Sequence, residues 1–425
     1  MDKLTVIEIC AGAGGQALGL EQAGFEHTVA IEIDSHAATT LRSNLGADRV
    51  REGDVADRHV WDPREFTGRV DLLAGGVPCP PFSTAGRQLG AQDERDLFAW
   101  AVETAGVVAP RALLLENVRG LSMPRFAAYR QHVLDRLREL GYVGDWRLLN
   151  ASDYGVAQLR PRFVLVALRR EDFAYFSWPE AAPTSKTVGS ELQSMMSEGK
   201  WEHAAEWASM ADGIAPTIVG GSKRHGGADL GPTRAKAAWR RLAVDGMGVA
   251  DAPPKFGEPR PSVKPPRLTV EMVARLQGWD ADDPAHRTWL ENLSGRKTAK
   301  YRQIGNAFPP PVARAVGTQI ALALSHSGAP RSQSEQIDPV HDDVYRVLRE
   351  ASGFITADAI ITAVSNGLDA PTLERRMAHL SADFAIEVKT TAKGPAYKLG
   401  QFKAFTGQED HHRFDYLTRY RSKVS

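Results

Sequence analysis

The chain has 425 residues, of which 43% are hydrophobic and 24% charged, with a formal net charge of zero, as is ordinary for a soluble globular protein of one or several domains. No apolar run reaches the roughly 18 to 20 residues of a membrane helix, and the first residues lack a signal-peptide pattern, so we expect a cytoplasmic protein that does not contact membranes. Two cysteines, Cys10 and Cys79, exclude a disulfide framework and a four-thiolate zinc site, and we expect no metal centre.

The first 170 residues alternate short apolar runs with amphipathic ones. Buried strands are predicted over residues 4–10, 27–33, 70–77, 112–118 and 162–169. Helical patterns that end at a glycine separate them, for example over residues 14–24 and 126–141. This alternation predicts an α/β fold with a doubly wound, mostly parallel, Rossmann-like sheet, whose ligands bind at the carboxyl ends of the strands.

A glycine-rich turn, ICAGAGG, follows the first predicted strand and opens the first predicted helix. Gly12 and Gly14 let a ligand approach the free amides at the start of that helix. Glu32 ends the next strand twenty residues after Gly12, where an acidic side chain accepts hydrogen bonds from a ribose. Asp54, after a third strand, is placed to hold an adenine amino group. The pattern predicts an adenosine-containing cofactor and does not separate a nicotinamide nucleotide from S-adenosylmethionine.

Residues with reactive side chains cluster at the ends of the predicted strands. Cys79 lies between prolines just after residues 70–77, which favours a reactive thiolate held in one direction over a packing role. Glu116 ends a leucine-rich strand, where burial would raise the pKa of a carboxyl group and allow general-acid work. Arg160 and Arg162 are alternate residues and share one face of an extended segment. Taken singly, each of these residues is consistent with a purely structural role. Taken together, they provide a nucleophile, an acid and a cation.

Regular patterning stops between residues 171 and 266. This stretch is too long for a loop in a compact domain, so we expect a small irregular subdomain or a disordered insert, and Trp239 favours the subdomain. Residues 221–302 contain 16 lysines and arginines against 9 aspartates and glutamates. That excess of positive charge indicates either contact with a polyanion or a chance asymmetry of charge on a solvent-exposed surface.

Patterning returns in the last third of the chain. Helices are predicted over residues 267–279, opened by Thr269, and over 309–325, started by prolines. Residues 327–337 have the composition of a linker. Three helices and a hairpin follow, which predict a winged-helix-like α+β unit over residues 338–425. Its charges are balanced, so a role in protein contact or folding fits the sequence as well as DNA binding does.

Six blocks occur in chain order: ICAGAGG, PCPPFS, ENV, QLRPR, RLTVEMVARLQGW and QIGNAFPPPVARAVG. The ordered set resembles the bacterial C5-type DNA cytosine methyltransferases of restriction-modification systems. The resemblance covers residues 4 to about 324 apart from the variable middle. It implies an S-adenosylmethionine-dependent catalytic domain over residues 1–170 and 267–326, and a target recognition region over 171–266. It also implies methyl transfer to C5 of a cytosine in a specific double-stranded DNA site.

The same resemblance implies roles for single residues. Cys79 would add to C6 of a flipped-out cytosine and make C5 nucleophilic. Glu116 would hold the N3 and amino edge of the base, Arg160 would steady the base, and Arg162 would support the site. The residues carried over to the cofactor site are Cys10, Ala11, Gly12, Gly14, Glu32, Ile33, Asp54, Val55, Pro78 and Asn306. The family usually has Phe at position 10, so we expect Cys10 to serve in packing.

The resemblance also indicates DNA contacts and partners. Residues 83–96 resemble the family's mobile loop that closes over DNA. The candidate DNA contacts are Ser83 and Arg87 in that loop and, from charge, Ser222, Lys223, Arg224, His225 and Arg234. We expect a monomer on double-stranded DNA, with a cognate restriction endonuclease as a functional and not necessarily physical partner.

Three other functions remain for comparison. A zinc-dependent cytosine deaminase needs His-x-Glu and Pro-Cys-x-x-Cys, and neither occurs. A tRNA cytosine-5 methyltransferase of the same fold is the closest alternative; the long variable region argues for duplex DNA instead. A catalytically silent DNA-binding regulator would use the C-terminal unit and would not need Cys79, Glu116 and Arg160.

Overall fold

The computed structural model describes residues 3–77, 95–220, 227–331, 341–364 and 367–403. Its centre is a seven-stranded sheet in the order β3-β2-β1-β4-β5-β7-β6. The strands are β1 (Leu4–Ile9), β2 (Phe25–Glu32), β3 (Val50–Glu52), β4 (Leu72–Gly76), β5 (Ala112–Val118), β6 (Tyr142–Asn150) and β7 (Pro161–Arg169). β1 to β5 run parallel, and β7 pairs antiparallel with both β5 and β6. The predicted mostly parallel sheet is therefore confirmed.

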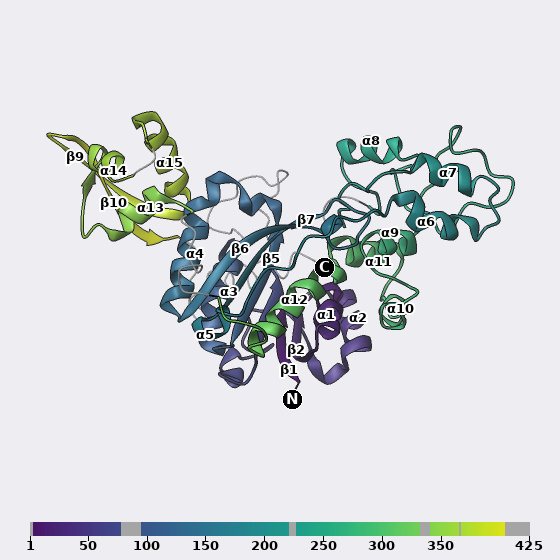
Figure 1. Cartoon of the computed structure of the whole chain (residues 1–425), viewed down its shortest axis with the longest axis horizontal. Helices are drawn as coiled ribbons and strands as arrows, with labels where there is room; N and C mark the ends of the chain where they lie inside the picture. Colours follow the sequence, from purple (N-terminus) through teal and green to yellow (C-terminus); the bar gives the residue numbers. More distant parts are fainter. Residues whose placement is uncertain (1–2, 78–94, 221–226, 332–340, 365–366, 404–425) are drawn as a thin grey trace, which may run out of the picture.

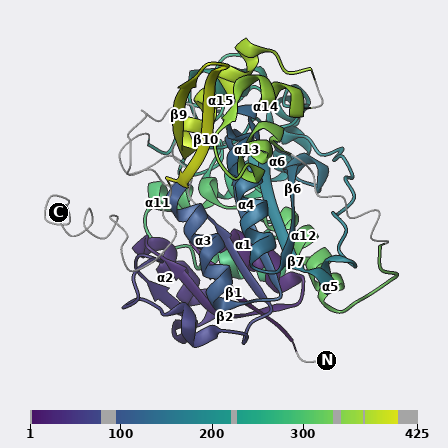
Figure 2. The ribbon, with the colours of Figure 1, turned by 90° about the vertical axis from the view of Figure 1, so that its left-hand side faces the viewer.

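Helices cover both faces of the sheet. α3 (Arg95–Val108) and α4 (Ala127–Glu139) lie side by side across one face, as Figure 2 shows, while α1 (Gly15–Gln22) and α12 (Pro310–Leu324) cover the other. Val6 and Ile7 of β1 are both fully buried, and they belong to the clusters on opposite faces. α2 (Ser35–Leu45) packs beside β2 and β3. Burial on both faces explains why these strands are almost continuously apolar.

Short connections complete this part of the molecule. They are the 3₁₀ turns η1 (Ala47–Arg49), η2 (Pro63–Phe66), η3 (Arg119–Ser122), η4 (Pro124–Phe126) and η5 (Ala151–Asp153), with the short helix α5 (Arg170–Phe173) after β7. η3 and η4 lead from the end of β5 directly into α4.

The described residues of the segment 171–266 form short helices around buried tryptophans. The helices are α6 (Val188–Ser197), α7 (Ala204–Met210) and α8 (Thr233–Arg241). Trp201, Trp207 and Trp239 are at most 3% exposed. Their cluster extends to Leu276 of α9 (Val270–Leu276), whose first turn Thr269 caps as predicted. α10 (Pro284–Glu291) and α11 (Lys297–Asn306) follow. The described part is thus a packed subdomain that shares a core with the elements after it.

A C-terminal unit packs against α4 and stands apart from α6, α7 and α8, which lie on the other side of the molecule (Figure 1). Its elements are α13 (Asp343–Glu350), β8 (Ile355–Thr356), α14 (Ala357–Ala363), α15 (Ala370–Asp383), β9 (Phe384–Thr391) and β10 (Gly394–Phe402). The strands form an antiparallel sheet in the order β8-β10-β9. The predicted three helices and hairpin are present, with β8 as an additional short strand.

No helix within the described ranges has the length and hydropathy that crossing a bilayer requires.

Candidate functional site

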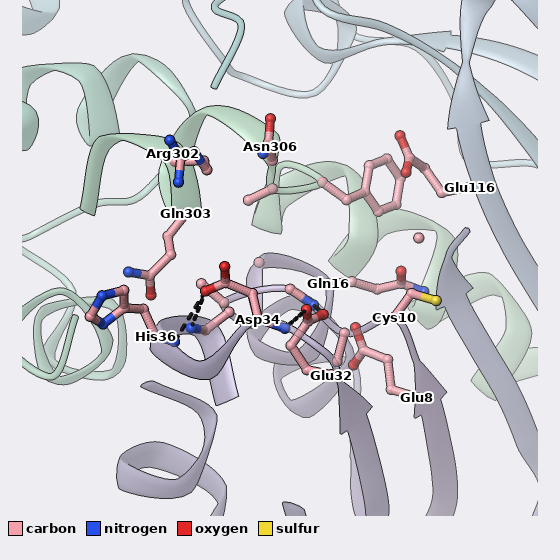
Figure 3. Close-up of a pocket in the computed structure, with 18 of the residues that line it drawn as sticks. Glu8, Cys10, Gln16, Glu32, Asp34, His36, Glu116, Arg302, Gln303 and Asn306 are labelled. Carbon is pink, nitrogen blue, oxygen red and sulfur yellow. Dashed lines mark hydrogen bonds between the residues drawn. The ribbon is translucent and has the colours of Figure 1, made fainter. Parts of the chain in front are cut away.

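A cavity of about 180 Å³ lies at the carboxyl ends of β1, β2, β4 and β5. Figure 3 shows α11 forming its opposite wall, with Arg302, Gln303 and Asn306 above the strand ends. The lining residues are Glu8, Cys10, Ala11, Gly12, Ala13, Gly15, Gln16, Glu32, Asp34, His36, Ala37, Gly76, Glu116, Ala299, Arg302, Gln303, Asn306, Ala307 and Phe308. This is the edge of the sheet at which the sequence predicts a ligand site.

The turn after β1 leaves room for a ligand at Gly12. Cys10, Gly12 and Gly14 all have positive φ angles, of 51°, 57° and 90°. A Cβ atom on Gly12 would meet nothing within 4 Å, whereas one on Gly14 would lie 1.9 Å from the ring of Trp289. Gly12 therefore gives a ligand access to the backbone, and Gly14 makes space for a tryptophan outside the cavity.

Glu32 closes the turn with its side chain. Its two carboxylate oxygens accept hydrogen bonds from the amides of Gly12 and Asp34, each at 2.7 Å. Burial raises the pKa of Glu32, although these two hydrogen bonds oppose the rise. Asp34 in turn caps α2 by accepting from the amides of His36 and Ala37 (Figure 3). The predicted ribose acceptor is thus fixed in place, with oxygen lone pairs left for a ligand.

Two buried polar side chains on the cavity floor are absent from the sequence prediction. Oε1 of Glu8 and both amide atoms of Gln16 are buried and have no hydrogen-bond partner among the described residues. The other oxygen of Glu8 lies 2.8 Å from Nε2 of the equally buried His27. Burial raises the pKa of Glu8, and His27 opposes that rise. An acidic residue within the apolar run LTVIEIC is the signal that marks this position.

The α11 wall is held by side chains from other segments. Oε1 of Gln303 accepts a hydrogen bond of 2.6 Å from Thr40, and its amide donates to the carbonyl of Ser294 at 2.8 Å. Asn306 lines the cavity, as predicted. Arg302 and Gln303 line it as well, and the sequence analysis did not select them.

Besides Gly14, three described residues of the predicted cofactor set do not line the cavity. Ile33 is 59% exposed, and Val55 is 4% exposed and belongs to the core cluster on the α3 side of the sheet. Asp54 accepts a hydrogen bond from the amide of Ala56 at 3.0 Å. Their cofactor roles stay predictions.

Glu116 lies at the end of the cavity where Cys10 also lies (Figure 3). One oxygen of Glu116 contacts Nε of Arg162, and both side chains are about one-tenth exposed. β5 and β7 are antiparallel neighbours, which brings these two residues together. The adjacent Asn117 donates a hydrogen bond of 3.2 Å to the carbonyl of Val77, the last described residue before Pro78 and Cys79.

Arg160 has a different environment from Arg162. It is 1% exposed and donates to three carbonyl groups, those of Ile218, Gly305 and Ala307, at 2.7 to 2.9 Å. These contacts tie the start of β7 to the segment 171–266 and to both sides of Asn306. Arg160 and Arg162 share the edge of the site, but Arg162 is the one that contacts Glu116.

Several predicted residues lie outside the described ranges: Pro78, Cys79, Ser83, Arg87, Ser222, Lys223, Arg224 and His225. Arg234 is described and is exposed on α8, as are Arg240 and Arg241. Among the described residues, no group of three or more histidine, cysteine and acidic side chains is placed to hold a metal ion.

Comparisons with known proteins give one family. The model described as C-5 cytosine-specific DNA methylase matches residues 4–322. The Type II methyltransferase M.NaeI of Lentzea aerocolonigenes is 59% identical over 425 residues, which is 100% of both chains. The Type II methyltransferase M.NgoMIV of Neisseria gonorrhoeae is 48% identical over 325 residues, 76% of this chain and 98% of that protein.

A solved structure of a Spodoptera frugiperda DNMT2 mutant is similar in fold, with a TM-score of 0.50 and 16% identity over 75% of this chain and 99% of that one. At this identity the likeness concerns the fold alone.

Proposed function

Because the chain belongs to the C-5 cytosine-specific DNA methylase family, we propose that its cavity binds S-adenosylmethionine and that Cys79 forms a covalent bond to the target base. The chain is a DNA (cytosine-5-)-methyltransferase, and it transfers a methyl group to C5 of cytosine. The family match favours DNA over tRNA as the substrate. It also argues against a catalytically silent DNA-binding regulator.

The cavity has the donor and acceptor groups that S-adenosylmethionine requires. Glu32 would accept hydrogen bonds from the ribose hydroxyls with its remaining lone pairs. The buried, unpartnered Glu8 Oε1 and Gln16 amide would face the charged amino-acid end, since such groups are costly to bury unless a ligand pairs with them. Asn306 would contribute from α11. When bound, the cofactor supplies an electrophilic methyl group carried by a sulfonium.

The base would occupy the end of the cavity near Glu116. We assign the Cys79 thiolate to bond formation at C6, which breaks the aromaticity of the ring and makes C5 nucleophilic. After methylation C5 loses its proton, and β-elimination breaks the sulfur–C6 bond and returns the thiolate. The described chain supports this assignment because it reaches Val77 beside Asn117 and Glu116, two residues before Cys79.

Glu116 and Arg162 would act on the base as a pair. A carboxylate at this place accepts a hydrogen bond from the cytosine amino group and stabilises a proton on N3 as charge develops. The contact between Arg162 and Glu116 favours Arg162 over Arg160 as the cation beside the base. We assign Arg160 to positioning, because carbonyl groups already accept from its guanidinium.

Recognition and partners follow from the same proposal. Residues 171–266 would be the target recognition region that selects the duplex site, and the cytosine must leave the base stack to reach the cavity. The catalytic domain would comprise residues 1–170 and 267–326. We further propose, from the relatives' designation as Type II methyltransferases, that the chain is the modification enzyme of a restriction-modification system and acts as a monomer on duplex DNA in the bacterial cytoplasm.

Transfer of a labelled methyl group tests this function. Purified protein, S-adenosylmethionine labelled on the methyl group, and either duplex DNA or tRNA are incubated, and label is counted in each nucleic acid. We expect label in DNA and none in tRNA, and loss of incorporation in Cys79→Ser. Cys10→Ser removes the other thiol of the chain, and at saturating S-adenosylmethionine it should still transfer label, because Cys10 lines the cavity but forms no bond to the base. Full activity in Cys79→Ser would overturn the role assigned to Cys79.

A further inference from the structure

The C-terminal unit has the arrangement of a helix-turn-helix with a β-hairpin wing. α14 and α15 form the helix pair, and β9 and β10 form the hairpin that follows directly. The second helix of such a pair is the one that enters a DNA groove in the known complexes. The unit lies beyond residue 322, where the family match ends, so the methyl transfer described above does not account for it.

The unit is fixed to the catalytic part through α4. His132 of α4 lies among rings of the unit, with centroid distances of 5.3 Å to Phe384 and 4.3 Å to Phe402, and its Nδ1 lies 3.0 Å from the hydroxyl of Tyr345. Arg349 of α13 pairs with both Asp135 and Glu139 of α4. An interface of buried rings and paired charges holds the unit in one orientation relative to the sheet.

That orientation places the unit beyond the carboxyl ends of the parallel strands. In Figure 1 the chain starts at the bottom, and α15 with the hairpin rises at the upper left, while α8 rises at the upper right. α4 is joined to the end of β5, which carries Glu116, by η3 and η4. The unit and the target recognition region therefore stand on opposite sides of the edge at which the DNA must present its cytosine.

One surface of the unit carries cations that form no ion pair among the described residues. Leu373, Met377 and Leu380 turn one side of α15 into the core of the unit. The exposed residues of α15 include Glu374, Arg375, Ala378, His379 and Ala382. The small side chains of Ala378 and Ala382 on this surface would let a DNA groove approach α15 closely.

The hairpin adds exposed Lys389 and Lys393. Among the described residues, no carboxylate forms an ion pair with Arg375 or with either lysine, whereas Arg376 neutralises Asp342 and Asp343. Asp369 and Glu374 are exposed beside Arg375, so the surface is of mixed charge, and Arg375, Lys389 and Lys393 are the cations on it that are available to a phosphate backbone.

We propose that the C-terminal unit binds duplex DNA that flanks the target site, through Arg375, Lys389 and Lys393. The unit would lengthen the enzyme's footprint on the side opposite the target recognition region, and it would add affinity without reading the target cytosine. The helix-turn-helix arrangement and the place of the unit beside the edge at which DNA presents its cytosine favour DNA over a protein partner.

A binding series on duplexes of two lengths tests the proposal. The duplexes are centred on the site that bisulfite sequencing of DNA from expressing cells locates, with about 5 or about 25 base pairs on each side. Affinity is measured between about 0.05 and 0.2 M salt for the full chain and for the triple variant Arg375→Ala, Lys389→Ala, Lys393→Ala. The triple variant should bind the long duplex at least about tenfold more weakly at 0.1 M salt, and its slope of log affinity against log salt should be smaller by about 3.

The control removes three exposed cations near the amino ends of β1 and β4, away from the cavity: Lys3→Ala, Arg64→Ala and Arg69→Ala. Lys3 and Arg64 form surface ion pairs with Glu26 and Asp62, which contribute little to stability. This control should bind both duplexes as the unchanged protein does, and both triple variants should methylate the short duplex at the original rate. An unchanged salt slope in the Arg375, Lys389 and Lys393 variant would overturn the proposal, as would an equal loss on the two duplexes. Absence of any methylated site in the cells would instead contradict the proposed function.

Discussion

Arg160 and Arg162 show how two neighbouring arginines acquire separate roles. The guanidinium of Arg160 donates to three backbone carbonyls from two segments, one at residue 218 and one at residues 305–307, so its removal leaves those acceptors buried without donors. Arg162 instead contacts a single carboxylate at the cavity, that of Glu116. In the sequence the two are two positions apart, and both fall on the same face of an extended segment. The distinction depends on which elements pack around β7.

We therefore predict that the alanine variants of Arg160 and Arg162 lose different properties. Arg160→Ala should lower the free energy of unfolding by about 3 kcal/mol or more, because several buried carbonyls lose their donor, and should weaken cofactor binding through Asn306. Arg162→Ala should leave cofactor binding nearly unchanged and lower kcat/KM for DNA by about 100-fold. It should cost less stability than Arg160→Ala, because the Glu116 carboxylate left without its cation lines the cavity and can be solvated there. Thermal unfolding, calorimetric titration of S-adenosylmethionine and methyl transfer separate them. Equal stability of Arg160→Ala and the unchanged protein would contradict the assignment.

At the scale of elements, the packing of α4 against α13 depends on neutral histidines. Burial lowers the pKa of His132 and of His341 to about 4, each from an ordinary value near 6.5. The cations Arg349 and Arg136 near His132, and Arg130 near His341, act in the same direction, while Glu139 and Asp145 oppose it. Because the released chain binds protons at a higher pH than the packed one, stability is complete above about pH 6.5 and is lost as the pH falls toward 4.

The interface should accordingly loosen in acid. Each histidine contributes up to about 3 kcal/mol to the loss, from a shift of roughly 2.5 units at 1.36 kcal/mol per unit. Hydrogen–deuterium exchange over α13, compared at pH 7 and pH 5 after correction for intrinsic exchange rates, measures the effect. His132→Asn combined with His341→Asn should reduce this pH dependence. The same pH dependence in the double variant would contradict the role of the histidines.

The sequence predicted some of the strands and site residues and not others. Strand ends with reactive side chains, such as Glu32 and Glu116, were predicted because apolar runs mark buried strands. β6 was not predicted, since Asp145 and Arg147 interrupt its apolar pattern in a strand at the edge of the sheet. Glu8 and Gln16 were not predicted, because their buried polar atoms become recognisable as ligand contacts only when the cavity around them is known. That cavity requires α11, almost 300 residues later in the chain.

At the scale of the whole molecule, the cavity links two functions that the sequence places far apart. Gly12 follows the first strand, Glu32 ends the second, Glu116 lies on the fifth, and Asn306 ends a helix that follows the proposed target recognition region. A cofactor at Glu32 and a base at Glu116 would meet in one enclosed space that α11 covers. The proposed target recognition region shares its core with α9 and α11, so binding of a DNA site would be coupled to the α11 wall of the cavity through packed side chains.

The proposed mechanism requires a covalent bond between Cys79 and cytosine, and this bond can be trapped. In a duplex with 5-fluorocytosine at the target position, C5 has no proton to lose after methylation, so elimination is blocked and the adduct remains. Intact-mass spectrometry of the protein incubated with this duplex and S-adenosylmethionine should show a one-to-one adduct, and peptide mapping should place it on Cys79. No adduct, or an adduct that persists in Cys79→Ser, would contradict the account.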